Sequence, residues 1–331
     1  MKSDIDHLMG AADLDALLIT GPAQHNPTMF YLTGGAHMTH AELIKKRDEQ
    51  AVLYYYPMER DEAARSGLQT RDLMEYNYEA LLKECGGDAA QATAKRYQQM
   101  LLDHGIDSGR IAVYGRIEAG QSYTVFAALQ EIMSDLEIIG EVGTSVLLQA
   151  METKDADEVE RIRRMGKVTI EVVDRVAKFL QTHKAQEGVL VKDDSQPLTI
   201  GDVKSQISSW VAELGAENPH GVIFAIGHDA GVPHSTGNAH DPLALGKTIV
   251  FDIFLQEPGG GYHFDFTRTW CLGYAPDAEQ DLYDDVRFVF DDIMGGLESN
   301  APFSLLQKRT CALFEEQGHP TIQSSPRAQE G

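Results

Sequence analysis

The chain has 331 residues with 51 acidic and 28 basic side chains, a formal net charge of −23 at pH 7. The charge is spread over both halves without a basic tract, which argues against a nucleic-acid ligand because phosphate contacts need clustered Lys and Arg. No apolar run reaches the ~18 residues that a transmembrane helix needs, so no membrane contact is predicted. A chain of this length and ordinary composition predicts a globular protein with two domains.

The three cysteines are far apart in the sequence and odd in number: Cys85, Cys271 and Cys311. This pattern predicts reduced thiols, neither a disulfide framework nor a zinc cluster. The first residues, Met1 to His7, contain no apolar signal-peptide core. Together these features predict a cytoplasmic protein.

The first part of the chain alternates strand and helix signals. Short apolar runs at 16–20, 51–56 and 111–115 predict buried strands, and 89–105 and 120–136 predict helices. We therefore expect an α/β domain over residues 1–147. Its basic cluster, Lys45-Lys46-Arg47, is expected to be solvated. Its histidines lack ligand spacing and are expected at the surface: His25, His37 and His40.

A second domain is predicted over residues 148–331. Asp155 followed three residues later by Glu158 indicates a capping box that opens a long amphipathic helix ending near Lys184. A second helix is expected from Thr199, with Asp202 in its first turn, to Gly215. A strand at 221–226 and helices at 279–294 and 302–317 complete the prediction.

Two β-type runs, 249–255 and 262–270, flank a turn at 257–260 and carry one aspartate each. A symmetric hairpin places Gln256 opposite Gly261, and then Asp252 lies directly opposite Asp265 on the same face. Opposed Cβ atoms are about 4.5–5.5 Å apart. Two poorly solvated carboxylates at that distance need a proton or a cation between them. Paired metal ions about 3.5–4 Å apart, a recurring device for hydrolysis, fit the span.

A simpler interpretation of these residues is two solvated aspartates on an exposed strand face, or one aspartate that caps a turn. Asp is disfavoured in the middle of a strand, and here two occur in register, which favours a functional role. A bulge would separate them.

The loop between the 221–226 strand and the hairpin carries His228, His234 and His240. Each alone is more often a surface residue. We single out His234 as a catalytic candidate because Pro233 fixes the direction in which the imidazole leaves the loop. A neutral imidazole there can donate a hydrogen bond to a carbonyl oxygen as it gains charge.

The block Gly261-Tyr262-His263-Phe264-Asp265-Phe266-Thr267-Arg268-Thr269, with the Pro233-His234 loop, resembles the creatinase/prolidase family of metallopeptidases. Residues 151–164 resemble the family's linker helix, and Met29 to Gly34 resemble its amino-terminal domain. The resemblance implies an α/β amino-terminal domain followed by an α+β catalytic domain of the pita-bread fold.

The resemblance also implies a function and a site. The family holds two divalent ions, with Mn²⁺ expected first and Co²⁺ or Zn²⁺ next, and hydrolyses Xaa-Pro bonds as an aminopeptidase or dipeptidase. Asp252 and Asp265 match two metal ligands, His234 matches a histidine near the substrate carbonyl, and Thr267 matches a position that steadies the ligands. Peptides with proline in second position are the expected substrates, and a homodimer is the expected assembly.

Two departures from the family pattern stand out. Phe254 occupies a place that is usually small, and the aspartates are two residues further apart than usual, which preserves their common face. The family's other histidine and two glutamates are not found, since only His319 and Glu330 remain near the end. We therefore expect an incomplete chain that lacks three metal ligands and the general base, is inactive and binds metal poorly.

Two alternatives remain open at this stage. One is a creatinase-like, metal-free hydrolase of a small guanidino compound, against which the paired aspartates argue. The other is a non-catalytic binding module with the pita-bread fold, for which degenerate aspartates would be the mark.

Overall fold

The computed structural model describes residues 1–324 and divides into two compact units. The first unit comprises Met1–Met165 together with Gln256–His263, and the second comprises Gly166–Leu255 and the residues from Phe264 onward. Glu330, one of the two residues considered for the missing metal ligands, lies outside the described residues. The same holds for Ser325 to Gln329. Among the described helices, none has the length and apolarity to cross a membrane.

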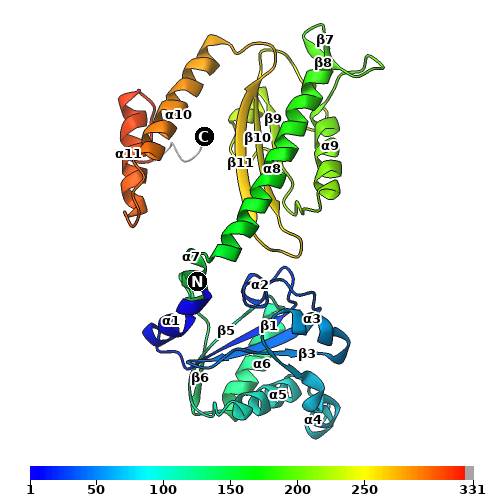
Figure 1. Ribbon diagram of the computed structural model, residues 1–331, viewed down its shortest axis with the longest axis vertical. Coiled ribbons are helices and arrows are strands. Elements are labelled where there is room, and N and C mark those ends of the chain that lie inside the picture. The colour runs from blue at the N-terminus through cyan, green and yellow to red at the C-terminus, as the bar shows by residue number, and fades with distance from the viewer. Residues whose placement is uncertain (325–331) are drawn as a thin grey trace. The chain divides into compact units, whose positions relative to one another are not determined.

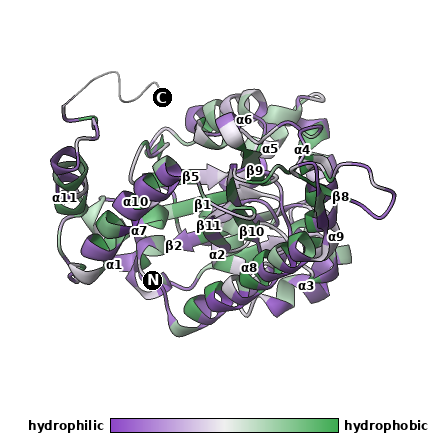
Figure 2. Cartoon of the chain, turned by 90° about the horizontal axis from the view of Figure 1, so that it is seen from above, coloured by the Kyte–Doolittle hydropathy of each residue, from purple (hydrophilic) through white to green (hydrophobic). Residues whose placement is uncertain are grey.

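The first unit is built on a six-stranded mixed sheet with β1 inside it, paired in parallel with β5 and antiparallel with β2. Every residue of β1 is buried, as its uninterrupted apolar run predicts for a strand covered on both faces. Figure 2 shows this strand as hydrophobic. In sheet order the strands are β4 (Gln69–Asp72), β3 (Val52–Tyr55), β2 (Ala41–Lys46), β1 (Ala16–Gly21), β5 (Gly109–Gly115) and β6 (Leu136–Ile139).

Alternate side chains of β1 enter two separate hydrophobic cores, so helices cover both faces of the sheet (Figure 1). Leu17 and Ile19 pack in the core with Met9 and Met29, whereas Leu18 packs in the core on the other face. One core is covered by α1 (Ile5–Ala11), α2 (Pro27–Thr33), α3 (Arg60–Arg65) and α7 (Val146–Glu152). The other is covered by α5 (Ala89–Asp103) and α6 (Ala119–Ile132), with α4 (Tyr78–Glu84) packed on α5. Short 3₁₀ turns occupy Lys2–Asp4, Pro57–Glu59 and Leu73–Glu75.

The three predicted strands of this unit are confirmed, and the structure adds β2, β4 and β6. Strand β2 was hidden because the sequence indicates a solvated charge cluster there. That expectation is wrong for Lys45, which is buried: its ammonium group donates to Asp6 Oδ1 and to the carbonyl of Glu49, both at 2.5 Å. The partner carboxylate comes from α1, so the local sequence does not reveal it.

Glu42, also on β2, is fully buried and forms the centre of a polar cluster. Its Oε1 accepts hydrogen bonds from Tyr97 at 3.0 Å and His40 at 2.8 Å, and lies 3.8 Å from the Arg96 guanidinium. The expected surface role is therefore wrong for His40, which is half-buried, while His25 and His37 are exposed.

We predict that His40 gives the first unit a pH-dependent stability. Burial lowers the pKa of His40, but the hydrogen bond and negative charge of Glu42 outweigh it, so the net pKa is raised. Its stabilising contribution is then complete below the ordinary pKa of about 6.5 and is lost as pH rises through the higher folded-state pKa. Urea unfolding from pH 5.5 to 8.5, compared with His40→Gln, measures this loss. An equal slope in both proteins would contradict the prediction, and His37→Gln is the matched exposed control.

The second unit begins within α8 (Ala156–Thr182), and the predicted capping box at its start is confirmed. Asp155 N donates to Glu158 Oε2 at 2.8 Å, and Glu158 N donates to Asp155 Oδ1 at 3.0 Å. Helix α9 (Ile200–Glu213) has the same device in Thr199 and Asp202. The prediction runs α8 too far, because Lys184 already belongs to the hairpin β7 (Lys184–Gln186) and β8 (Val189–Val191).

The sheet of the second unit contains β9 (Ile223–Ile226), β10 (Thr248–Gln256) and β11 (His263–Cys271), in the order β11-β10-β9 (Figure 1). One face is apolar: Phe251 and Ile253 are fully buried, and the Phe264 ring packs closely on Gly166 of α8. A Cβ at Gly166 would lie 2.8 Å from that ring, so glycine is needed there. Because side chains alternate along a strand, Asp252 and Asp265 lie on the opposite face.

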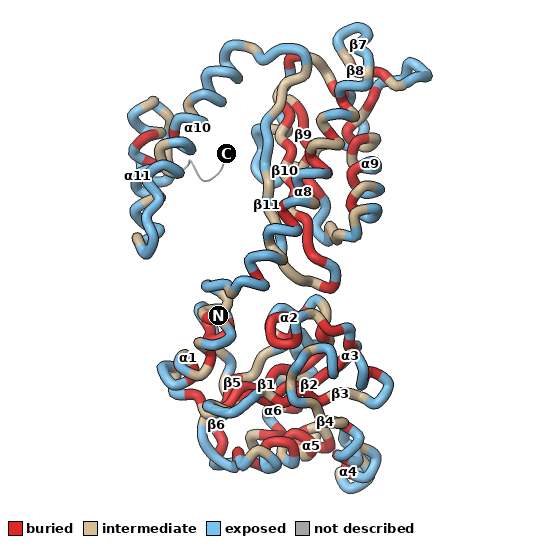
Figure 3. Tube along the Cα trace, viewed as in Figure 1, coloured by how far each residue is buried: buried red, intermediate tan, exposed pale blue. Residues whose placement is uncertain are grey.

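The last helices, α10 (Asp277–Gly295) and α11 (Phe303–Glu316), agree with prediction to within a few residues. They pack on each other through Arg309, which donates twice to Asp292 at 3.0 Å. Both helices and β11 remain largely exposed (Figure 3). Within the described chain β11 is an edge strand, the arrangement that favours aggregation unless it is covered.

Candidate metal centre

The β10–β11 hairpin has a different register from the predicted one. Glu257 N donates to Tyr262 O at 2.9 Å, Thr267 Oγ1 donates to Asp252 Oδ1 at 2.6 Å, and Thr248 Oγ1 lies 3.9 Å from Cys271 Sγ. Along β10 the paired residues are spaced by five and four positions, and along β11 their partners have the same spacing. The three pairs therefore belong to one register. It places Thr267 opposite Asp252, and the prediction that Asp265 is directly opposite is wrong by two residues. In the structure Glu257 pairs with Tyr262, whereas the predicted hairpin pairs Gln256 with Gly261.

Asp252 and Asp265 nevertheless share a face, because a shift of two residues preserves the side-chain alternation. Partial burial, the negative charge of Asp252 and a hydrogen bond shared with Asp252 raise the pKa of Asp265. The two carboxyl groups therefore repel each other, as expected for a pair without a cation between them. The prediction that both carboxylates are poorly solvated is wrong for Asp265, which is exposed, while Asp252 is half-buried.

Thr267 is the third member of this group. Its hydroxyl donates to Asp252, which leaves the other oxygen of that carboxylate available to a cation or a water molecule. The same register places Phe254 opposite Asp265, and the Phe254 ring lies 6.1 Å from that of His220. Phe254, the unusual residue of the sequence pattern, thus borders the aspartates.

His234 lies in the loop after β9 and is exposed, as are His228 and His240. Ser235 N donates to Val232 O at 3.0 Å, and His234 has a φ of 62°. Pro233 and His234 therefore form the centre of a type II turn, in which the third residue normally is Gly or Asn. Pro233, with its fixed φ, occupies the second position of this turn, and the catalytic role of His234 stays a prediction.

This strained position predicts opposite effects for two substitutions. His234→Gly should leave the second unit as stable or slightly more stable, because glycine adopts positive φ without steric cost. His234→Val should destabilise it by roughly 1–2 kcal/mol, because a β-branched residue clashes there. Urea unfolding followed by tryptophan fluorescence measures both, since Trp210 and Trp270 belong to this unit. Equal losses in the two variants would contradict the turn assignment.

The segment directly after His234 is held by two elements, α9 and β9. Lys204 of α9 donates to Thr236 O, and Gly201 N donates to Ala239 O at 2.9 Å. Gly237 packs against β9 so closely that a Cβ would lie 2.4 Å from Phe224 O. The imidazole therefore projects from a position directly before an anchored segment.

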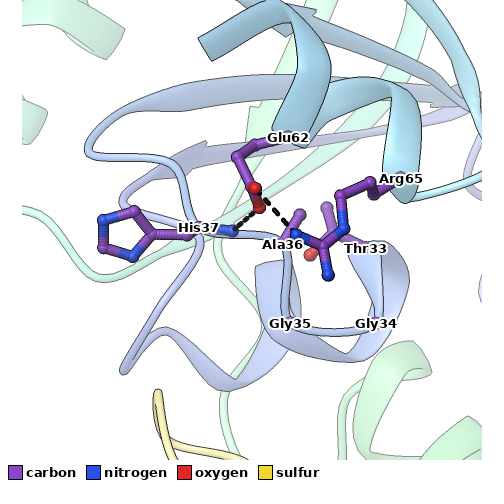
Figure 4. A pocket seen from close by; sticks show the side chains of 7 residues that line it. All are labelled: Thr33, Gly34, Gly35, Ala36, His37, Glu62 and Arg65. Atoms are coloured by element: carbon purple, nitrogen blue, oxygen red, sulfur yellow. Dashed lines mark hydrogen bonds and ion pairs between the residues drawn. The ribbon is translucent and has the colours of Figure 1, made fainter.

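A cavity of about 480 Å³ lies in the first unit, at the end of α2 (Figure 4). Glu62 accepts hydrogen bonds there from His37 N at 3.2 Å and Arg65 at 2.9 Å, so its charge is already compensated. None of the predicted site residues lines it. The aspartate pair, and not this cavity, is therefore the candidate site.

The remaining ligands expected by resemblance are not assembled in the described residues. Across residues 1–324 no group of three or more His, Cys, Asp or Glu is arranged to hold a metal ion. His319 pairs with Asp285 of α10 at 2.9 Å. It fastens the α10–α11 hairpin.

Sequence reasoning missed the side chains that hold the tip of the β10–β11 hairpin. Glu257, almost fully buried, accepts hydrogen bonds from Arg161 and Arg164, and Tyr262 donates to Glu158. The signal in the sequence was Glu257 directly before Pro258, interpreted only as part of a turn.

Comparison with known proteins agrees with this architecture. The model of metallopeptidase family M24 matches residues 160–326, and the creatinase/prolidase amino-terminal domain matches residues 3–142. The chain belongs to metallopeptidase family M24, with a creatinase/prolidase-type amino-terminal domain.

Curated and solved relatives point to the same class. A probable dipeptidase PepE of Mycobacterium tuberculosis is 27% identical over 144 residues, which cover 44% of this chain and 34% of that protein. The match thus spans about a third of that relative's length. The fold of a dipeptidase from Pyrococcus horikoshii superposes with a TM-score of 0.70 at 16% identity, covering 96% of this chain and 78% of that one. An Xaa-Pro dipeptidase from Bacillus anthracis gives 0.69 at 16% identity, with the same coverage. These structures establish the fold: an α/β amino-terminal domain and a pita-bread domain.

Proposed function

We propose that the chain is a metal-dependent Xaa-Pro peptidase of the aminopeptidase or dipeptidase type, with residues 148–331 as its catalytic domain. The observation that carries the proposal is the pair Asp252 and Asp265 on one face of the β10–β11 hairpin, with Thr267 bound to Asp252. Family membership and relatives named as dipeptidases and prolidases support the same substrate class.

The aspartate pair suits a divalent cation. Two carboxyl groups that repel each other gain stability when a positive charge binds between them. We propose two ions, Mn²⁺ first and Co²⁺ or Zn²⁺ next, with Asp252 and Asp265 as ligands. When bound, such ions lower the pKa of a water molecule so that it can attack a peptide carbonyl. The further ligands and the general base are assigned to no described residue.

The chain's own residues then have distinct roles. Thr267 holds one oxygen of Asp252 and so fixes the orientation of that carboxylate. We propose that His234 donates a hydrogen bond from its neutral imidazole to the substrate carbonyl oxygen as that oxygen gains negative charge. The substrate is a peptide with proline in its second position, and the assembly is a cytoplasmic homodimer that binds neither nucleic acid nor membranes. Sedimentation velocity tests the dimer.

A metal titration distinguishes the proposed function from its alternatives. After chelator treatment, the chain is titrated with Mn²⁺ and assayed with Xaa-Pro dipeptides and with creatine. Weak Mn²⁺ binding that needs both aspartates, without turnover, is the expected result for these 331 residues. Two tight Mn²⁺ sites would contradict our proposal that ligands beyond Asp252 and Asp265 are required. Creatine hydrolysis that survives the chelator selects the metal-free hydrolase, and no binding of either kind selects a non-catalytic module.

A further inference from the structure

The tip of the β10–β11 hairpin is held by one face of α8. The Glu257 carboxylate accepts hydrogen bonds from Arg161 at 2.7 and 3.1 Å and from Arg164 at 2.5 Å. On the other side of the turn, directly before β11, Tyr262 donates from its hydroxyl to Glu158. Glu158 and Arg161 are one helical turn apart, so a single face of α8 contacts the residue after β10 and the residue before β11. We call these residues the tip clamp.

The tip clamp joins residues that are direct partners across the hairpin. Glu257 N donates to Tyr262 O at 2.9 Å, and Gly261 N donates to Glu257 O at 3.1 Å. The Arg161 guanidinium lies 5.0 Å from the centre of the Tyr262 ring, so it contacts both members of the pair. Within the clamp Glu257 is 8% and Glu158 3% exposed, whereas the side chain of Arg164 is largely exposed. Removing the Glu257 carboxylate would leave the largely buried Arg161 without its ion-pair partner, which is unfavourable.

A competing register is available to this hairpin. A slip of two residues leaves every side chain on its present face, so side-chain alternation does not oppose it. That register is symmetric about the Glu257-Pro258-Gly259-Gly260 turn and places Asp265 directly opposite Asp252. Among the described strands β11 pairs only with β10, so no second neighbour fixes its position.

We propose that Glu257 is a positioning residue whose ion pairs with Arg161 and Arg164 hold the hairpin in the register that sets Thr267, and not Asp265, opposite Asp252. In the slipped register Thr267 would lie opposite Val250 and could not donate to Asp252. The consequence for metal binding rests on the proposed function, whereas the register itself does not.

Disulfide trapping reads the register directly. In a Cys85→Ser, Cys311→Ala background, Thr248→Cys faces the native Cys271 in the observed register; the wild-type atoms are 3.9 Å apart. A second reporter, Thr248→Cys with Thr269→Cys and Cys271→Ser, forms a bond only after the two-residue slip. With Glu257 intact, the first reporter should oxidise readily and the second slowly.

Glu257→Gln should slow the first reporter by roughly tenfold and speed the second, because a disulfide needs Cβ atoms about 3.5–4.5 Å apart. Glu171→Gln, which breaks an exposed ion pair of α8 with Arg175, is the matched control and should change neither rate. Unchanged rates in Glu257→Gln would overturn the proposal. If Glu257→Gln fails to fold, Tyr262→Phe removes one hydroxyl from the same clamp and must shift the two rates in the same direction.

Both reporters are read without metal, so the two ideas fail separately. If Glu257→Gln changes the register but the unmodified chain binds no Mn²⁺, the result counts against the peptidase function alone. A register that ignores Glu257 would count against the positioning role alone.

Discussion

Arg96→Met should destabilise the first unit by about 3–5 kcal/mol, the largest effect that we expect from a single substitution. Arg96 is buried and supplies the positive charge that faces the fully buried Glu42, 3.8 Å away. Without it, Glu42 keeps hydrogen bonds from His40 and Tyr97 but loses the permanent positive charge of the guanidinium. Far-UV circular dichroism during urea unfolding measures the loss.

The double variant Glu42→Leu, Arg96→Met is the informative companion. Removing both charges eliminates the desolvation penalty, so it should recover at least about 2 kcal/mol relative to Arg96→Met alone. Tryptophan fluorescence is an internal control, because both tryptophans lie in the second unit. A double variant less stable than Arg96→Met would show that the cluster contributes through packing and not through charge compensation.

Asp252→Asn should abolish saturable Mn²⁺ binding by the chain. With two carboxylates in the described site, the unmodified chain is expected to bind with a Kd on the order of 0.1–1 mM, the range of weak carboxylate sites. An amide oxygen is a neutral and weaker ligand, and its NH₂ group would face Asp265. Electron paramagnetic resonance of free Mn²⁺ measures the bound fraction directly.

Two further variants give this test its contrast. Thr267→Val should weaken Mn²⁺ binding by about tenfold, the usual effect of removing a partner that orients a ligand. Asp277→Asn, at the start of α10, changes the net charge equally but lies outside the site and should leave binding unchanged. Binding that persists in Asp252→Asn would remove the physical basis of the metal centre.

The sequence alone determined the elements whose signals are local. The capping box at Asp155, the helix start after Thr199, the apolar run of β1 and the two strands of the hairpin all depend on residues close together in the chain. The common face of Asp252 and Asp265 belongs here too, because it depends only on side-chain alternation within each strand.

Only the tertiary structure decided which register that hairpin adopts and which charges are buried. A slip of two residues leaves the local pattern unchanged, so the choice depends on Glu257 meeting Arg161 of α8. Glu42 and Lys45 can be buried because Arg96 and Asp6 compensate their charges. Both partners come from other elements of the fold. A charged side chain can leave water only when a partner compensates it, and a partner from a distant segment has no signature in the local sequence.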